Sequence, residues 1–524
     1  MRRSYCRAVR RQAATNTRTS GAQIDVDRYP RDSGKREQAL PHGDSTFLRV
    51  QPLLVSRSGL EDLSSPLPET SNRASRRICR AAPPRLPHIF RRPGMTSQQS
   101  SHPLPPETPS YSNYVLAALF VVYIFNFVDR QILAILIQPI KEDLGVSDTM
   151  MGLLTGPVFV VSYTLAGLPL ARWADRHSRV WLITVGLAMW SAMTVASGLA
   201  RSFTQLAVAR LGVGLGEASF TPSAHSLISD YFPAHRRATA LAIFAAGASL
   251  GTIAGYLGGG YIGEYIGWHE AFFYVGAPGL IVAVIFRWTV RDPVRGAYDG
   301  PQASARNEPL SEVLRYLITR RSYVFIVASA MLHGFSSYGA GYWIPTFLIR
   351  VHDLSLSEVG IILGAFVGVA SFVGQIVGGR ISDSLAGRDS RWYMWVPAIS
   401  SLVALPFLVA FLLIPNLYWA VGCYVVGGTA VNMWTGPTYA MAQGVAKPSM
   451  RSMAAAIVIF MLNLVGAALG PLIVGILNDW LDPRFGAEAI RYSLMIVIVP
   501  HTLASIFNLL AARTLPEDLQ KASS

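Results

Sequence analysis

The chain of 524 residues is 51% hydrophobic and only 15% charged, a balance that excludes a string of ordinary soluble domains. Its net charge of +14 comes mainly from residues 1–94, which hold 19 Lys and Arg against eight Asp and Glu. The remainder is close to neutral, so the basic balance gives no reason to expect a nucleic acid partner.

Residues 1–110 form a basic tail that is rich in Arg, Ser and Pro and has no apolar period. That composition predicts disorder. The Arg content would suit a transit peptide, but the acidic residues argue against one. A coding sequence whose true start is Met95 explains the tail equally well. Cys6, Cys79 and Cys423 have no spacing that predicts a disulfide or a metal site.

About twelve apolar windows, each long enough to cross a bilayer, follow the tail. We place them at 114–137, 151–170, 180–200, 205–228, 238–262, 271–289, 324–349, 359–379, 392–414, 417–443, 453–477 and 492–512. Since backbone polar groups cannot remain unpaired in lipid, these windows must be helices. We predict an all-α polytopic membrane protein with six-helix bundles at 111–290 and 323–513. A cytoplasmic linker at 291–322 joins them, and a short cytoplasmic tail at 514–524 follows.

The distribution of positive charge predicts the orientation. From Met95 onward the chain has 26 Lys and Arg, and with a cytoplasmic N-terminus 19 of them lie in or beside cytoplasmic segments. Five fall outside, namely Lys141, Arg201, Arg350, Arg484 and Arg491, and the other two, Arg130 and Arg210, lie within apolar windows. Because Lys and Arg favour the cytoplasmic side, we expect both termini there, in a bacterial inner membrane or a plasma membrane.

Four charged residues lie within the apolar windows, Asp129 and Arg130 in the first and Arg210 and Glu217 in the fourth. A charge at the centre of a membrane helix costs about 2.5–3.5 kcal/mol on insertion scales, so it is kept where it faces protein or water. Two charges of each sign favour a proton or ion pathway. The alternative is a static salt-bridge network that only fixes helix packing.

Helical spacing places these charges on shared faces with other polar or small residues. Asn126 lies three and four residues before the charged pair of the first window, on the same face. In the fourth window, Gly214, Thr221 and His225 continue the charged stripe, and Gly214 leaves room for another helix to approach. We expect the two charged faces to meet in one network.

Two polar loops recur at similar positions, 171–179 and 379–388, with their aspartates 208 residues apart. Both are similar to a cytoplasmic loop pattern of the major facilitator superfamily, which the chain resembles over about residues 110–515. Ala171 and Ser178 stand where that pattern has glycine. The resemblance implies a latch on the cytoplasmic side, and ordinary positive loop charge is the alternative. The gating residues that it implies are Asp175, Arg176, Arg179, Asp383 and Arg388.

Within the fourth window, the segment Arg210-Leu-Gly-Val-Gly214-Leu-Gly216-Glu217-Ala218 is similar to the superfamily's fourth-helix motif. With Tyr123-Ile-Phe-Asn-Phe-Val-Asp129-Arg130 in the first window, it resembles the spinster-like branch. Members of that branch move lysophospholipids and sphingosine phosphates, and proton coupling is implied for bacterial ones. The resemblance implies that Asp129 and Glu217 carry protons and that Arg130 and Arg210 are their partners. Burial raises a carboxylate's proton affinity and a nearby Arg lowers it, so a moving helix could load and release a proton.

A stripe of glycines occupies every fourth position of the fifth window. Its members are Gly247, Gly251, Gly255, Gly259 and Gly263. Small residues on one face let helices pack closely. The superfamily's antiporter motif places a proline after one such glycine, whereas here Tyr256 follows, so we predict close packing and sliding and draw no conclusion about antiport.

The second half carries polar and aromatic residues in place of charges, which suits an amphiphile with a charged head and an oily tail. We expect substrate contacts from Tyr123, Asn126, Thr221, His333, Tyr338, Trp343, Asn432, Trp434, Tyr439 and Asn463. Packing residues and interfacial aromatics are the alternative for many of them. We interpret His333 and His225 first as structural histidines.

We predict a secondary transporter, coupled to protons, for an amphiphilic or lysolipid-like anion. The alternatives are a proton symporter for a small organic anion, such as a sugar acid or an aromatic acid, and a membrane receptor or scaffold without transport. The sequence has no phosphate-cradling Gly-rich loop and no soluble domain large enough to hold a nucleotide, so we expect no enzymatic activity. We also expect no cofactor and no metal. We expect a monomer whose partners are the bilayer, protons and a small-molecule or lysolipid substrate.

Overall fold

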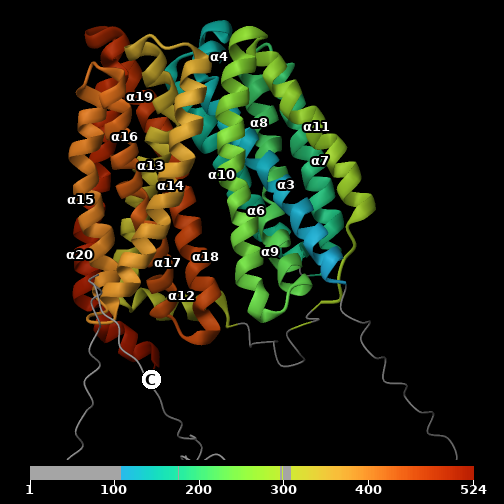
Figure 1. The fold of residues 1–524 in the computed structure, drawn as a ribbon, viewed down its shortest axis with the longest axis vertical. Coiled ribbons are helices and arrows are strands. Elements are labelled where there is room, and N and C mark those ends of the chain that lie inside the picture. Colours follow the sequence, from blue (N-terminus) through green and yellow to red (C-terminus); the bar gives the residue numbers. More distant parts are fainter. Residues whose placement is uncertain (1–107, 175, 296–297, 299–307, 524) are drawn as a thin grey trace, which may run out of the picture. The chain divides into compact units, whose positions relative to one another are not determined.

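Twelve helical passes, grouped six and six, make up the part of the chain that the structure describes (Figure 1). The structure is a computed structural model and describes residues 108–174, 176–295, 298 and 308–523. The predicted tail to residue 107, Asp175, and residues 296–297 and 299–307 of the predicted linker therefore lie outside the described residues. All of the described residues belong to one unit, Gln99–Ser524.

The first bundle runs from α3 to α11, and one of its passes contains a π-helical turn. Its helices are α3 (Pro109–Ile135), α4 (Ile137–Leu144), α5 (Asp148–Leu153), the π-helical turn η1 (Leu154–Val158), α6 (Phe159–Ala174), α7 (Arg179–Gly198), α8 (Phe203–Glu217), α9 (Phe220–Tyr231), α10 (Ala234–Tyr265) and α11 (Trp268–Thr289). Pro157 lies in η1 and has no amide hydrogen to donate, which accounts for the wider turn.

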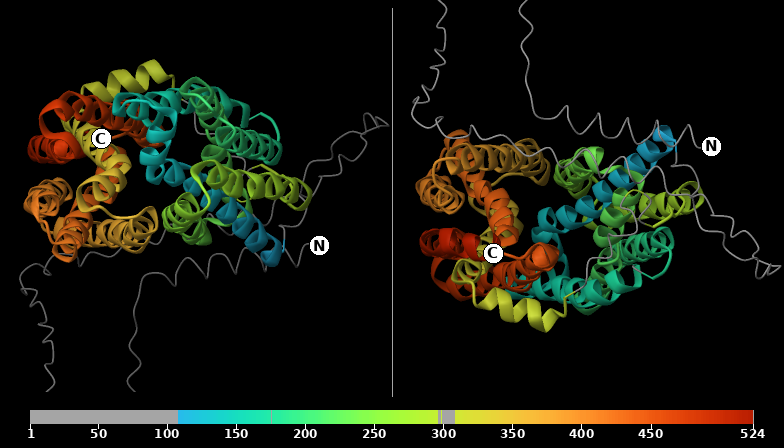
Figure 2. Two further views of the ribbon diagram at one scale, coloured as in Figure 1. Left: turned by 90° about the horizontal axis from the view of Figure 1, so that it is seen from above. Right: turned by 90° about the horizontal axis from the view of Figure 1, so that it is seen from below.

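The second bundle runs from α13 to α20 and is interrupted in the same manner. Its helices are α13 (Arg321–His352), α14 (Leu356–Ala386), α15 (Trp392–Leu413), α16 (Leu417–Val431), η2 (Asn432–Trp434), α17 (Thr435–Gly444), η3 (Pro448–Met450), α18 (Arg451–Met461), η4 (Leu462–Ala467), α19 (Ala468–Phe485), η5 (Gly486–Glu488) and α20 (Ala489–Ser523). Seen from above and below, the two bundles form separate groups of helices (Figure 2).

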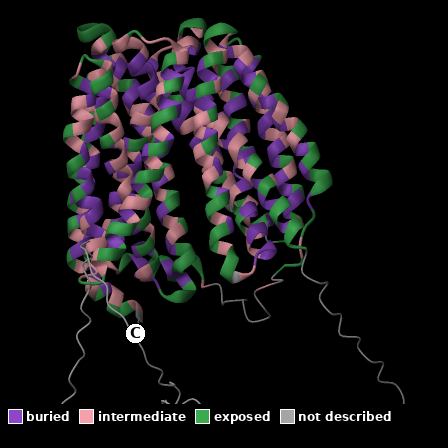
Figure 3. Cartoon of the chain, viewed as in Figure 1, coloured by how far each residue is buried: buried purple, intermediate pink, exposed green. Residues whose placement is uncertain are grey.

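Eight candidate membrane spans meet criteria of length and hydropathy in the described residues, and the last of them, Pro448–Ala522, contains two passes. The passes that do not meet the criteria are α8 with α9, α13, and α16 with α17. The first and third are broken near their middles, and α13 carries many polar residues. Many residues on the outer faces are exposed (Figure 3). Large apolar side chains such as Leu165 and Ile281 are among the exposed residues, as expected for a surface that lipid covers.

The predicted boundaries differ from the helices at two places. A short helix, α12 (Leu310–Ile318), lies within the predicted linker, with Val313 and Leu317 buried against the second bundle. The last pass, α20, continues through the predicted tail to Ser523. Ser322 donates its backbone N–H and its hydroxyl to the Asp518 carboxylate, which holds this extension against α13. Hydropathy marks where lipid ends, and a helix need not end there.

The glycine stripe of α10 packs along α3, as predicted. A Cβ at Gly251 would lie 2.5 Å from the Ile124 carbonyl oxygen and 2.7 Å from Phe127 Cβ. The other glycines of the stripe meet α3 or the adjoining Leu136 in the same way. At Gly258, one position off the stripe, an added Cβ would meet no described atom within 4 Å. The stripe therefore allows two backbones to approach closely.

Gly251→Ala is expected to destabilise the protein by about 1–3 kcal/mol, because the added methyl group overpacks the contact with α3. Gly258→Ala is the matched control, since it adds the same group to the same helix in open space. Thermal unfolding of the purified variants measures the difference. Equal midpoints for the two variants would contradict the close contact.

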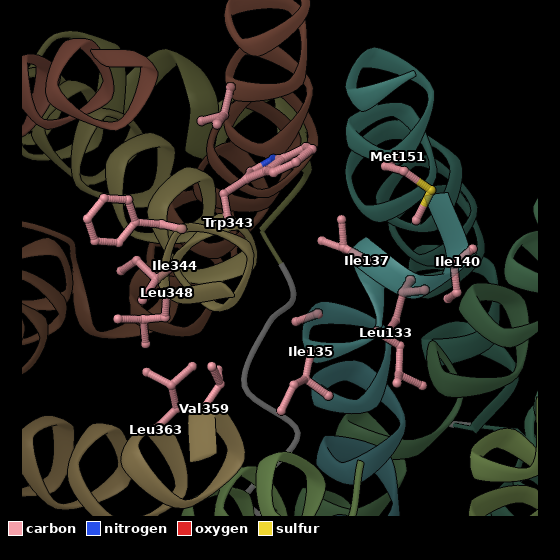
Figure 4. Close-up of a cluster of buried hydrophobic side chains, with 14 of the residues drawn as sticks. Leu133, Ile135, Ile137, Ile140, Met151, Trp343, Ile344, Leu348, Val359 and Leu363 are labelled. Atoms are coloured by element: carbon pink, nitrogen blue, oxygen red, sulfur yellow. The ribbon is translucent and has the colours of Figure 1, made fainter. Parts of the chain in front are cut away.

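One end of the molecule is sealed by an apolar cluster from both bundles. The cluster includes Leu133, Ile135, Ile137, Ile140 and Met151 from the first bundle and Trp343, Ile344, Leu348, Val359 and Leu363 from the second (Figure 4). The other two clusters of buried residues do not combine the bundles in this way. One is built from the first bundle with only Ala467 and Ala468 added, and the other lies wholly in the second bundle and α12. Within the described residues, the bundles are thus joined mainly at one end.

Candidate functional site

Four charged side chains from α3 and α8 lie inside the first bundle. Asp129, Arg210 and Glu217 are buried, and the Arg130 side chain is 21% exposed. Each lies on the inward face that the helical spacing predicted. Because a charge in such surroundings needs a partner, the pairing of these four groups determines what the site can do.

Arg130 and Glu217 form the shorter of two ion pairs. Arg130 Nε and Nη2 each lie 2.7 Å from Glu217 Oε2. The guanidinium also lies over three aromatic rings, 5.5 Å from the centroid of Phe127 and 5.1 Å from those of Phe159 and Tyr163. Glu217 Oε1 has no hydrogen-bond partner among the described residues. One carboxylate oxygen is therefore held twice and the other is free to bind a proton or a water.

Asp129 and Arg210 form the second pair, with Arg210 Nη1 3.4 Å from Asp129 Oδ2. Thr194 of α7 donates its hydroxyl to Asp129 Oδ1 at 2.7 Å. Arg210 also lies 4.8 Å from the centroid of the Phe272 ring. Its Nε and Nη2 have no hydrogen-bond partners in the described part of the chain. This pair is more deeply buried and less completely bonded than the first.

The two pairs link α3 to α8 at two neighbouring levels. The structure brings together all four of the charged residues that the sequence singled out, as the pairs Arg130 with Glu217 and Arg210 with Asp129. Gly214, between Arg210 and Glu217, packs against the Phe159 carbonyl of α6. Its missing side chain is what permits α6 to lie beside the charges.

A cavity of about 240 Å³ lies between the bundles beside Arg130. Residues of α3, α6 and α10 line one side, and residues of α13, α14 and η4 line the other. They include Arg130, Gln131, Tyr163, Thr252, Tyr256, Ser337, Tyr338, Tyr342 and Asn463. Of the predicted substrate residues, Tyr338 and Asn463 lie on this wall. The Arg130 guanidinium is the one charged group among the described lining residues, so the cavity suits an anion.

A second cavity, of about 190 Å³, lies within the second bundle. Asn432 and His501 are among its polar lining residues, and the described part of its wall contains no Asp, Glu, Lys or Arg. Most of the wall is apolar, from residues such as Ile344, Leu408, Phe411, Leu412, Leu494 and Ile498. Ser337, Gly341 and Val367 line both cavities. A cation-lined space and an oily space are therefore neighbours.

Comparison with known proteins decides the family. The model of the Major Facilitator Superfamily matches residues 119–471. An MFS-type efflux pump of Mycolicibacterium smegmatis is 32% identical over 383 residues, which cover 73% of this chain and 88% of the pump. The sphingosine-1-phosphate transporter SPNS2 of Mus musculus is 28% identical, covering 78% of each chain. The chain belongs to the major facilitator superfamily, in its spinster-like branch.

Solved structures agree with this assignment. A bacterial homologue of the human lysosomal transporter spinster, in an inward-facing and unoccupied conformation, matches with a TM-score of 0.73 and 30% identity. The match covers 78% of this chain and 99% of that one. The occupied, inward-facing form matches with a TM-score of 0.71 and 31% identity, over 78% and 98% of the chains. This facilitator is accordingly an integral membrane transport protein with the two-bundle fold.

Other residues predicted to contact substrate line neither cavity of this facilitator. Tyr123 stacks on Phe244 with ring centroids 4.4 Å apart. Trp343 is fully buried in the sealing cluster and donates its indole N–H to the Pro471 carbonyl at 2.9 Å. The other predicted substrate residues that line neither cavity are Asn126, Thr221, His333, Trp434 and Tyr439. Aromatic packing explains Tyr123 and Trp343 without a ligand.

Several lining residues escaped the sequence-based prediction. Gln131, Tyr163, Tyr256 and His501 line the cavities, and Thr194 bonds Asp129. Gln131 follows Arg130 directly, which was a usable signal. The others are not marked by a neighbouring charge, and nothing local distinguishes a cavity wall from a packed one.

The two recurring loops of the facilitator make contacts within their own bundles. Arg179 forms ion pairs with Asp230 and Asp292, and donates to Ser226 Oγ at 2.8 Å. Asp383 accepts a hydrogen bond from Tyr393 at 2.9 Å. Two further predicted gating residues, Arg176 and Arg388, are exposed. Asp175 lies outside the described residues, so its predicted role in the latch stays a prediction.

A polar network at the sealed end joins the bundles of the facilitator. Arg350 of α13 binds Asp148 of α5 through two hydrogen bonds of 2.6 and 2.8 Å. Lys141 Nζ lies 2.6 Å from the same carboxylate. Asp479 of α19 accepts the backbone N–H groups of Asp148 and Thr149 at 3.0 and 2.8 Å, which caps the start of α5. The second bundle thus supplies both a cation and a helix cap to the first.

Proposed function

We propose that this facilitator is a proton-coupled secondary transporter that moves an amphiphilic, lysolipid-like anion by alternating access. The observation that carries the proposal is the pair of neighbouring cavities, one with Arg130 in its wall and the other largely apolar. The anionic head of the substrate would bind the Arg130 guanidinium, and its hydrocarbon chain would occupy the apolar cavity. The name of the mouse relative, a sphingosine-1-phosphate transporter, supports a substrate of this chemistry.

Proton coupling would arise from competition for Arg130. The guanidinium now binds Glu217, and an anionic head in the cavity would draw it away. A buried carboxylate that loses its cation is costly to keep charged, so Glu217 would take up a proton in exchange. Substrate binding and proton binding would then favour each other, which is a coupling free energy between two sites.

We further propose that the sealed end faces away from the cytoplasm. Lys141 and Arg350, two of the few basic residues on the predicted outer side, lie in the network at that end. In this orientation the sealed end would make the state inward-facing in a bacterial inner membrane, and we propose that the protein acts there as a monomer. The two solved bacterial homologues are also described as inward-facing.

Flux into proteoliposomes tests the proposal. A radiolabelled lysophosphatidate is expected to move across the membrane faster with a pH gradient than without one, and an ionophore that collapses the gradient should remove the difference. Empty liposomes are the control for leakage. Equal flux with and without the pH gradient would contradict proton coupling, and an absence of any flux would favour a receptor or scaffold.

A small organic anion is the second candidate substrate, because the cavity beside Arg130 could hold one without use of the apolar space. Thermal stabilisation of the purified protein separates the two candidates. Lysolipids are expected to raise the unfolding midpoint, while sugar acids and aromatic acids should leave it unchanged. The reverse pattern would favour the small-anion symporter.

A further inference from the structure

A chain of hydrogen bonds runs between α20 and α13 inside the second bundle. Asn508 Nδ2 lies 3.3 Å from His333 Nε2, and His333 Nδ1 lies 3.1 Å from His501 Nδ1. All three side chains are buried. The Trp434 ring stacks on the His333 ring, with centroids 4.8 Å apart. This stacking and the two hydrogen bonds fix the orientation of both imidazoles.

This series of hydrogen bonds ends at His501, in the wall of the apolar cavity. His501 is a lining residue of that cavity, and its Nε2 has no hydrogen-bond partner among the described residues. Leaving a buried polar atom unpaired costs about 1–3 kcal/mol. Native proteins leave few such atoms, and each needs an explanation, such as a functional role, a bound water or an ion. An unpaired, buried nitrogen on a residue that lines an oily cavity is therefore a candidate binding point.

Either imidazole can be the donor in the hydrogen bond between the two histidines. If His333 Nδ1–H donates to His501, then His501 Nε2 carries its proton and is a donor. If His501 Nδ1–H donates to His333, its Nε2 is an acceptor and His333 Nε2–H requires the Asn508 amide to present its oxygen. Both arrangements are uncharged. The free nitrogen can therefore meet a donor or an acceptor without ionisation.

We propose that His501 is a substrate-contacting residue that recognises an uncharged hydroxyl or carbonyl group in the chain of the amphiphile. His333 and Asn508 are positioning residues, because their hydrogen bonds hold the His501 ring in place. The group must be uncharged, since no Asp, Glu, Lys or Arg among the described lining residues is there to balance a charge. The inference rests on the proposed amphiphile substrate and adds a requirement for the chemistry of its apolar part.

Equilibrium binding to the purified protein tests this with two matched kinds of ligand. One is a stearoyl lysophosphatidate, and the other is a set of its derivatives that carry one hydroxyl at different points along the chain. The wild-type protein is expected to bind the best hydroxylated derivative about tenfold more tightly, which corresponds to one hydrogen bond worth about 1.4 kcal/mol. His501→Phe should remove this preference while it keeps affinity for the unmodified chain.

Two variants separate recognition from folding. His501→Gln retains a hydrogen-bonding group and is expected to keep part of the preference, whereas His225→Phe, a histidine outside both cavities, should keep all of it. Equal affinities for all ligands in the wild type would overturn the inference and leave the transporter proposal intact. A preference that survives in His501→Phe would also overturn it. If the wild type binds none of the ligands, the proposed substrate class and this inference both fail.

Discussion

Glu217→Gln is expected to abolish the response of substrate flux to a pH gradient while the protein stays folded. Glutamine has the same shape as glutamate and can still accept a hydrogen bond from Arg130, so the contact that holds α3 to α8 is kept in part. It cannot exchange a proton. Flux driven by the gradient should therefore fall to the level of liposomes without protein, measured in the proteoliposome assay.

Substrate binding by Glu217→Gln should not be lost. Arg130 no longer has a carboxylate competitor in this variant, so the anionic head is expected to bind at least as tightly as in the wild type. Glu517→Gln is the matched control, because the same substitution at an exposed carboxylate, in a surface pair worth about 0–1 kcal/mol, should leave flux unchanged. Gradient-driven flux that persists in both Glu217→Gln and Asp129→Asn would remove the proton-carrier assignment.

Asp148→Asn is expected to open the sealed end of the molecule. The substitution removes the bidentate ion pair with Arg350 and leaves Arg350 and Lys141 near each other without their shared carboxylate. Breaking a buried pair by removing one partner costs about 3 kcal/mol. That amount is large enough to move a two-state equilibrium between the sealed and open forms of this end.

Spin labels at two exposed positions across the seal, Glu142 of α4 and Arg484 of α19, measure the effect in a background without native cysteines. A longer distance should become more populated in Asp148→Asn. Arg491→Gln is the control, since it removes a salt bridge with Glu488 that lies within the second bundle. In the double variant Asp148→Asn with Arg350→Gln, the guanidinium left unpaired by the first substitution is gone, so the change should be smaller than the sum of the single effects. Strictly additive effects of the two substitutions would contradict a direct interaction between Asp148 and Arg350 that keeps this end closed.

The charged residues illustrate how far local pattern extends. Four charges in apolar windows had to face protein or water, and helical spacing placed each on an inward face. The partners did not follow from this. Arg130 binds Glu217 and Arg210 binds Asp129, which depends on how far α3 is shifted and rotated relative to α8. Thr194 joins from a third helix, and no spacing within α3 or α8 points to it.

The substrate residues show the opposite difficulty. Tyr338, Asn432 and Asn463 were predicted and line the cavities, but Trp343, from the same polar and aromatic stretch of α13, lies in the sealing cluster. Polar and aromatic side chains look alike in sequence whether they face a cavity or a neighbouring helix. Their surroundings come from segments more than a hundred residues away, as with Trp343 and Pro471.

The amino-acid sequence by itself determined that this protein is an all-helical membrane protein with about twelve passes and buried charges in its first and fourth. Hydropathy, helical period and charge are local properties, so they can be judged one window at a time. Only the tertiary structure decided which charges form the two ion pairs and which residues line each cavity. It also decided the closure of one end at Asp148, which lies at the start of α5 and binds Arg350, 202 residues away in the sequence. These features depend on how helices are offset against one another, and that offset is the sum of many weak contacts that no single window contains.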